Sequence, residues 1–101
     1  MEDLLEAKLN LDTSLIGWRE LQRHFASGCV IAVRPGLDLV EVALCVSRDE
    51  KSKVENWLET GRIGKASDDE ARIWYESNAM LWAVVVKPWV LVQEQKPDQL
   101  Q

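Results

Sequence analysis

The sequence is poor in the residues that carry most catalysis and that stabilise small secreted proteins. Its 101 residues include one histidine, two cysteines, three prolines and five glycines. Two cysteines are too few for a disulfide framework, and they do not have the spacing of a zinc site. Proline and glycine are too scarce for a collagen-like or disordered chain. With 47% hydrophobic residues, a chain of this length is expected to fold as one domain with its own core.

Long apolar stretches and basic stretches are also missing. The longest unbroken apolar run, residues 79–86, spans eight residues, whereas a membrane-spanning helix needs about 20. The first three residues are Met1, Glu2 and Asp3, which are acidic where a signal peptide would be basic. The formal net charge is −5, and no segment is basic enough to attract phosphate backbones. We therefore expect a cytoplasmic protein with reduced thiols that binds neither nucleic acid nor a membrane.

Apolar periodicity predicts helices in the first part of the chain. Residues 1–10 predict a short, weak helix with two leucines spaced four apart. A stronger helix is expected from an N-cap at Asp12 or Thr13 to a stop at Gly28. Its apolar stripe, with spacings of three and four residues, consists of Leu11, Leu15, Trp18, Leu21 and Phe25.

Two strands are expected to follow this helix. Residues 29–33 are apolar and rich in β-branched side chains, and residues 39–46 have Glu41 as their only polar residue. Pro35-Gly36 between them has turn chemistry, so we expect a hairpin whose loop includes Asp38. On such a strand Asp38 and Glu41 would lie on opposite faces and would not form a carboxylate pair.

The length of this hairpin loop decides how the two cysteines lie. If Arg34 faces Val40, Cys29 faces Cys45 directly, and if the loop is one residue shorter, Cys29 faces Leu44. The first register keeps alternate apolar residues of the second strand on one face, and we favour it. A disulfide is not expected even then, because the cytoplasm is reducing.

Two Ser-x-x-Glu sequences, residues 47–50 and 67–70, have the form of a helix capping box. We expect a helix after each, the first ending at Gly61 and the second at Asn78. Between these helices, residues 61–67 partly resemble a phosphate-binding loop. They lack its first glycine and its hydroxyl, and no strand precedes them, so we expect a tight turn instead.

The run 79–86 predicts a third strand. Pro88 cannot donate to a strand ladder, so it marks a bulge, a bend or an edge position before residues 89–92 resume extended structure. Residues 1–94 are expected to form a single domain, followed by a flexible polar tail at 95–101. The order ααββααβ(β) predicts an α+β fold, with a small antiparallel sheet of three to four strands and about four short helices.

No motif in the sequence defines an enzyme. His24 is the only side chain with an ordinary pKa near neutral pH, and Cys29 follows it across a turn. A Cys–His nucleophile would also need an orienting group and an oxyanion site, and the sequence offers neither. No group of potential ligands has the spacing of a metal site. We expect no cofactor and no metal.

Five tryptophans are many for 101 residues. Trp18, Trp57 and Trp74 fall on helical apolar stripes, which indicates core packing. Trp82 and Trp89 lie on either side of the proline break, and Trp89 is a candidate interface anchor. Stacking on nucleic-acid bases would need a basic groove beside these rings, and the chain is acidic.

Several segments together resemble a known family. The most specific are residues 37–43 (LDLVEVA) and 82–94, which include PWVLVQE at 88–94. Further matching positions are Leu9-Asn10, Thr13, Trp18, Glu20-Leu21, Phe25-Ala26, Gly28, Asp49, Trp57 and Trp74. Over residues 5–94, the chain resembles the small bacterial proteins grouped as domain of unknown function 2288. The resemblance implies a single domain and a bacterial cytoplasmic setting, and it transfers no catalytic residue.

Two classes of function remain open. Both faces of the expected strands are apolar, whereas small antiparallel sheets usually leave one face to water. This favours a non-enzymatic protein–protein interaction module, either a homodimer or a binder of another protein. The alternative is a small-ligand binder or enzyme with a pocket near Trp18, His24, Cys29 and Glu41. The candidate interaction or pocket residues are Trp18, His24, Asp38, Glu41 and Trp89.

Overall fold

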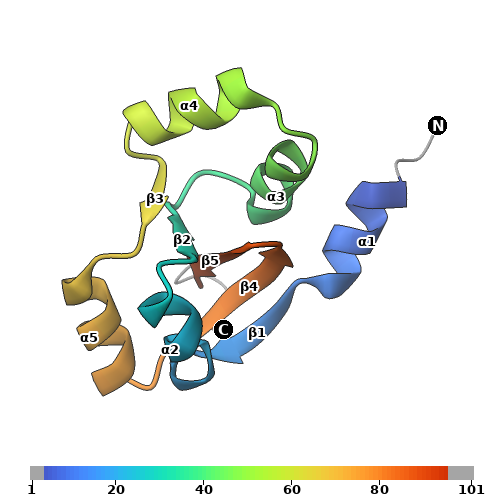
Figure 1. Ribbon diagram of the computed structural model, residues 1–101. Helices are drawn as coiled ribbons and strands as arrows, with labels where there is room; N and C mark the ends of the chain where they lie inside the picture. Colours follow the sequence, from blue (N-terminus) through green and yellow to red (C-terminus); the bar gives the residue numbers. More distant parts are fainter. Residues whose placement is uncertain (1–3, 96–101) are drawn as a thin grey trace.

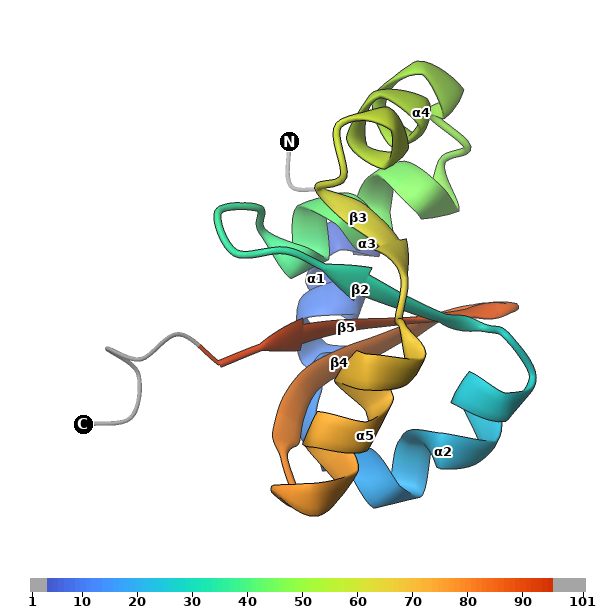
Figure 2. The same cartoon turned by 90° about the vertical axis from the view of Figure 1, so that its left-hand side faces the viewer.

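The computed structural model describes residues 4–95 as five helices and five strands in three layers (Figure 1). The helices are α1 (Leu4–Asp12), α2 (Trp18–Ala26), α3 (Leu39–Ser47), α4 (Lys51–Glu59) and α5 (Asp68–Glu76). The strands are β1 (Ser14–Gly17), β2 (Val30–Val33), β3 (Ile63–Lys65), β4 (Met80–Val86) and β5 (Trp89–Glu94). Helices α1, α3 and α4 lie on one face of the sheet, and α2 and α5 lie on the other (Figure 2).

The sheet has the strand order β1-β4-β5-β2-β3. Neighbouring strands are antiparallel except β2 and β5, which run parallel, with Val30 beside Val90. The α+β class is confirmed, but the expected antiparallel sheet of three to four strands with four helices is wrong in detail. The β4–β5 hairpin places β5 between β4 and β2, so a strand from the end of the chain runs alongside one from its first third.

Successive side chains of the central strands point to opposite faces of the sheet and belong to two hydrophobic clusters. On the α3 face, Leu91 and Val84 pack under α1, α3 and α4. On the α2 face, Val90, Val92 and Ala83 pack under α2 and α5. Helices therefore cover both faces, which explains strands that are apolar on both sides without a second copy of the chain.

The long helix expected from residue 12 to residue 28 is wrong. Helix α1 ends at Asp12, β1 follows, and α2 begins at Trp18. Leu11 and Leu15, expected on the buried stripe, are 86% and 38% exposed. The chain is extended here because β1 pairs with β4, with Leu15 opposite Trp82. The rest of the prediction holds: Trp18 and Leu21 are buried, and α2 is followed by a turn with Gly28 at φ 76°.

Residues 39–46, expected as a strand, belong to helix α3. The carboxylate of Asp38 accepts a hydrogen bond of 3.0 Å from the Val40 amide and so caps the helix rather than closing a hairpin. Five residues of α3 are buried and Glu41 is exposed. A short apolar run has no period that separates a buried helix from a buried strand, which is why the prediction failed.

Because residues 39–46 are helical, the predicted hairpin is wrong, and so are both of its registers. Cys45 lies in α3, whereas Cys29 precedes β2, and both are free thiols. Because the predicted hairpin does not form, Cys29 and Cys45 are not cross-strand neighbours. Instead, the Cys29 carbonyl accepts a hydrogen bond of 2.9 Å from the Val90 amide at the start of β5.

Only one of the two expected capping boxes forms. Ser67 accepts from the Glu70 amide at 3.1 Å, and the Glu70 carboxylate accepts from the Ser67 amide at 3.0 Å. Ser47, by contrast, is the last residue of α3, and α4 starts after Glu50 without a side-chain cap. Because the apolar run before it is helical, Ser47 lies within α3 and cannot cap α4.

The expected helix stops and the third strand are confirmed. Gly61 and Asn78 have φ angles of 75° and 53°, just after α4 and α5. Residues 63–65, expected within a tight turn, form the edge strand β3 against β2. Pro88 lies in the tight turn that joins β4 to β5, so it marks a bend between paired strands. Residues 96–101, most of the expected tail, lie outside the described residues.

Candidate functional site

A polar network holds the loop between β2 and α3. The Gln93 side-chain amide donates to the Leu37 carbonyl at 2.7 Å and to the Arg34 carbonyl at 3.2 Å. The Arg34 guanidinium donates to the Glu70 carboxylate, which also completes the α5 capping box. Burial alone would raise the pKa of Glu70, but hydrogen bonds from Arg34 and Ser67 hold it below its ordinary value. The loop is thus fixed from β5 on one side and α5 on the other.

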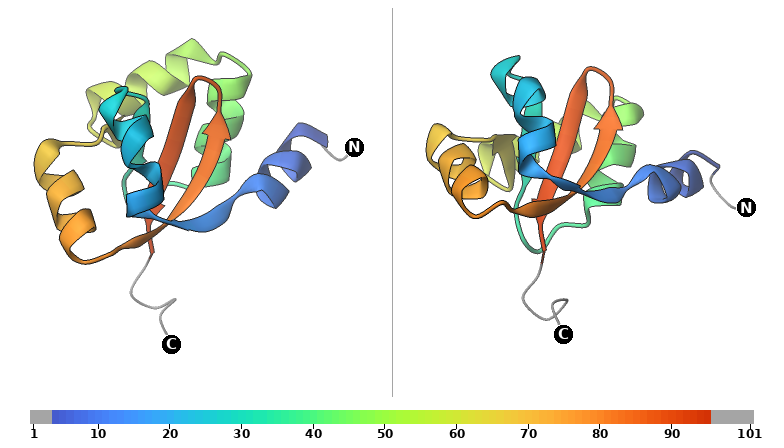
Figure 3. Two further views of the ribbon diagram at one scale, coloured as in Figure 1. Left: turned by 60° about the horizontal axis from the view of Figure 1, so that its bottom comes forward. Right: turned by 90° about the horizontal axis from the view of Figure 1, so that it is seen from below.

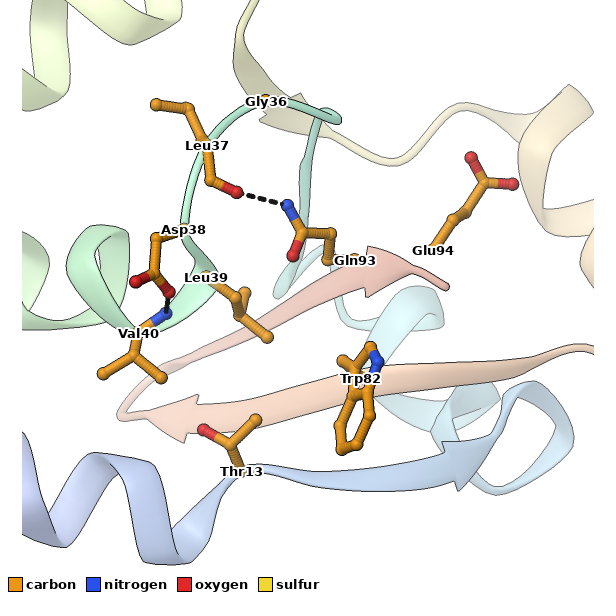
Figure 4. A pocket seen from close by; sticks show the side chains of 9 residues that line it. All are labelled: Thr13, Gly36, Leu37, Asp38, Leu39, Val40, Trp82, Gln93 and Glu94. Carbon is orange, nitrogen blue, oxygen red and sulfur yellow. Dashed lines mark hydrogen bonds between the residues drawn. The ribbon is translucent and has the colours of Figure 1, made fainter. Parts of the chain in front are cut away.

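The Trp82 pocket, a cavity of about 410 Å³, lies beside this loop (Figure 4). Besides Trp82, it is lined by Thr13, residues 36–40, Gln93 and Glu94. Its polar side chains already serve the fold: the Thr13 hydroxyl donates to the Leu9 carbonyl at 2.7 Å, Asp38 caps α3, and Gln93 holds the loop. Recruiting these groups for a ligand would break contacts that shape the pocket.

The structure brings only some of the sequence-predicted pocket residues together: the Cys29 amide donates to the His24 carbonyl at 3.0 Å, but Glu41 lies on the other face of the sheet. Trp18 is fully buried on the α2 face, with its ring 4.9 Å from that of Trp74. His24, half-buried on α2, lines a cavity of about 330 Å³ that Asp12 and Glu20 also line. Glu41 is exposed on α3, which packs on the opposite face of the sheet.

Trp89, the remaining candidate, lines a different cavity, which we call the Trp89 groove. The groove has a volume of about 260 Å³ and lies between α4, the end of α3 and the sheet. Its lining is apolar apart from one lysine side chain and consists of Ile31, Val46, Val54, Leu58, Ile63, Lys65, Trp89 and Leu91.

The groove exists because α4 packs mainly against α3 and β3 rather than flat on β2 and β5. Of the α4 residues, Trp57 is buried, whereas Leu58 is 49% exposed beside the groove. A second cavity of about 240 Å³ shares Val46, Val54 and Trp89 with it and is also lined by Asp49, Lys51 and Glu55. The two cavities therefore adjoin, and the second one has a charged rim.

Sequence reasoning located part of this groove. The position of Trp89 after the proline break suggested an interface anchor, and the structure places the ring half-buried in the groove wall. Val54 and Leu58, four residues apart on α4, both line the groove. Lys65 was missed because it lay in a segment expected to be a turn.

Within residues 4–95, no group of three His, Cys, Asp or Glu side chains is placed to hold a metal ion. No helix among these residues is long and apolar enough to cross a membrane.

Fold and cavities together define a small three-layer α+β domain with an open apolar groove on one face. The chain belongs to the family described as protein of unknown function (DUF2288), whose model matches residues 4–94. It is also similar to PA1075 from Pseudomonas aeruginosa, whose solution NMR structure superposes with a TM-score of 0.82 at 43% sequence identity. That match covers 97% of this chain and 91% of the other. No curated protein matches the chain.

Proposed function

We propose that this protein is a non-enzymatic interaction module that holds apolar side chains of a partner protein in the Trp89 groove. The supporting observation is the lining of the groove, in which every side chain but Lys65 is apolar. Apart from Lys65, the lining includes no side chain that could act as a nucleophile, acid or base. Such a site suits binding by burial rather than chemistry.

The energetics favour an occupant for this groove. Burying one leucine-sized side chain there would contribute roughly 1.5–3 kcal/mol through the hydrophobic effect. Tryptophan is enriched among the residues that dominate protein interfaces, especially in pockets ringed by less critical contacts. Trp89 in the groove wall and the half-exposed Leu58 beside it match this arrangement.

A chemical-shift titration with N-acetyl-leucinamide, a neutral mimic of a leucine in a chain, tests the proposal. We expect shifts confined to groove residues such as Trp89 and Val54, and we expect Leu58→Asp to abolish them. Ile73→Asp is the matched control, because Ile73 is 56% exposed on α5, across the sheet from the groove. Shifts that are absent, or that survive Leu58→Asp, would refute the proposal.

Self-association is a second form of interaction, and a different surface favours it. Leu4, Leu11 and Leu15 are exposed along α1 and β1, and α1 extends beyond the sheet beside β1 (Figure 3). Strand β1 forms one edge of the described sheet, and no charged residue lies within it. Unprotected edges of this kind pair with other chains. We propose a homodimer through this edge, in the bacterial cytoplasm.

A further inference from the structure

We infer that two copies of the chain join by antiparallel pairing of β1 with β1 of the second copy, about a two-fold axis at Leu15. The two sheets of five strands each then become one continuous sheet. This inference rests on the homodimer proposed above. It goes further by naming the register of the pairing and the hydrogen bonds that hold it.

The ladder between β1 and β4 fixes which backbone groups of β1 point outward. The Trp18 amide donates to the Ala79 carbonyl at 2.8 Å, so the amide of residue 18 faces the β4 side. Every second residue of an antiparallel strand faces the same neighbour, so the backbone groups of residues 14 and 16 also face β4. The amide and the carbonyl of Leu15 therefore point away from the sheet.

Four backbone groups in a row are left at this edge. Because the carbonyl and the amide of one trans peptide point in opposite directions, the Thr13 carbonyl and the Gly17 amide also face outward, on either side of the Leu15 pair. The Thr13 amide is not free, since it donates to the Leu9 carbonyl at 3.0 Å. Among residues 4–95, none of the four outward groups has a hydrogen-bond partner.

A second copy satisfies all four groups. With the axis at Leu15, the two Leu15 residues exchange two hydrogen bonds, and each Gly17 amide donates to the Thr13 carbonyl of the other copy. A strand of unrelated sequence would also present a carbonyl that requires a free amide at Thr13, and that amide is already used within α1 and its end. The order of the free groups is thus complementary to itself, which selects a second copy as the occupant.

Strand β1 also lacks the features that keep sheet edges from pairing. Residues 14–17 carry no charge and include no proline, whereas the opposite edge strand, β3, ends in Lys65. Charged residues and prolines are the usual protection of an exposed edge. Leu15 is 38% exposed on β1. In the inferred register, the two Leu15 side chains become cross-strand neighbours and cover each other.

Gly17→Pro and Gly17→Ala are a matched pair of variants that test the pairing. Gly17 has φ −67° and ψ 139°, which proline adopts without strain, and a Cβ there meets the Met80 sulfur at 3.6 Å, an ordinary contact. Both variants should therefore fold. Only proline removes the outward amide, and its ring takes the place of the Thr13 carbonyl of the second copy.

Sedimentation equilibrium measures the effect of these two variants on the dimer. Because Gly17→Pro removes two hydrogen bonds per dimer, we expect its dimer Kd to rise about tenfold or more. Gly17→Ala keeps the amide, and its Kd should stay within about twofold of the wild type.

Amide hydrogen exchange in the wild-type protein is a second measurement that needs no variant. In concentrated protein, the amides of Leu15 and Gly17 should be protected, and this protection should disappear on dilution to the single chain. The Ile16 amide faces β4 and should stay protected at both concentrations. This alternation along three successive residues is specific to pairing at the β1 edge.

The outcomes separate the register from the homodimer itself. A wild-type protein that is a single chain at every concentration would overturn both. A dimer whose Kd is unchanged by Gly17→Pro, or in which the Leu15 amide exchanges freely, would leave the homodimer and refute pairing through β1. If Gly17→Pro does not fold, exchange at Leu15 and Gly17 in the wild-type protein decides the question.

Discussion

The side-chain amide of Gln93 on β5 donates a hydrogen bond of 2.7 Å to the carbonyl oxygen of Leu37. A second hydrogen bond from the same amide nitrogen reaches the Arg34 carbonyl at 3.2 Å. One side chain from near the C-terminus thereby satisfies two carbonyls in the loop that leads into α3. The Arg34 amide also donates to the Arg62 carbonyl at 2.9 Å, and the Arg34 side chain pairs with Glu70, so Gln93 supplies the attachment of the loop to β5.

Gln93→Ala should therefore destabilise the fold by about 1–3 kcal/mol, the usual cost of leaving partly buried polar groups without partners. Urea unfolding measures this loss. Gln95→Ala is the control, since Gln95 also donates to a carbonyl, that of Met80 at 3.1 Å, but at an exposed site. Its effect should stay within about 0.5 kcal/mol. Equal losses in the two variants would show that Gln93 does not hold the loop.

The Arg34–Glu70 pair makes stability depend on pH. The pKa of Glu70 is lowered in the folded protein: burial acts against this, but hydrogen bonds from Arg34 and Ser67 outweigh it. A lowered folded-state pKa gives stability that is present above the unfolded-state pKa and is lost as the pH falls through the folded-state pKa. The wild-type protein should lose stability in this acidic window.

Glu70→Gln should flatten that acidic limb and should destabilise the protein by about 1 kcal/mol at pH 7. The figure is modest because Arg34 is 39% exposed and solvent screens the pair. Denaturant unfolding of both proteins between pH 3 and 7 provides the comparison. Asp69→Asn is the matched control, because Asp69 pairs with Arg72 at an exposed site, and its acidic limb should follow the wild type. An unchanged limb in Glu70→Gln would contradict the prediction.

The two thiols should react at very different rates. Cys45 is buried in α3, and burial, helped by the charge of Glu50, raises the pKa of its thiol. Cys29 is half-buried just before β2. In the native protein, Ellman's reagent at pH 8 should modify one thiol promptly and the second only after unfolding. Cys29→Ser should remove the fast phase, and a fast phase that persists in this variant would contradict the placement of Cys45.

Light scattering over a tenfold dilution tests the homodimer. The concentrated protein should have a mass of twice 11.5 kDa, and Leu11→Glu should reduce it to that of a single chain by placing a charge on the exposed edge surface. Ile73→Asp, which alters an exposed apolar residue elsewhere, should leave the mass unchanged. A wild-type mass near 11.5 kDa at every concentration would rule the dimer out.

Sequence reasoning located the features that depend on neighbouring residues. Gly28, Gly61 and Asn78 were recognised as helix stops, since residues in or near the left-handed region end helices by local geometry. The Ser67–Glu70 box was recognised because its two hydrogen bonds join residues three apart. The burial of Trp18 and Trp74 followed from helical spacing, although the helix expected from residue 12 to residue 28 wrongly included the residues that form β1.

The candidate groove was only partly visible in the sequence. Trp89 stood out as a possible anchor because it follows a proline that interrupts an apolar run. The groove itself depends on α4 standing away from β5, and on β5 lying parallel to β2. These contacts join residues about 30 to 60 positions apart, so no local pattern encodes them.

What the sequence by itself determined was therefore the family, the α+β class, the helix ends and most of the buried aromatic residues. Only the tertiary structure decided that residues 39–46 form a helix and that residues 14–17 form a strand. In both cases, contacts with distant parts of the chain select the conformation, because the local pattern does not. A run such as 39–46 is apolar on all sides and suits either conformation, so the choice falls to the surfaces that bury it. Leu15 has helical spacing to Leu11 and Trp18, but pairing of residues 14–17 with β4 satisfies their backbone as a strand.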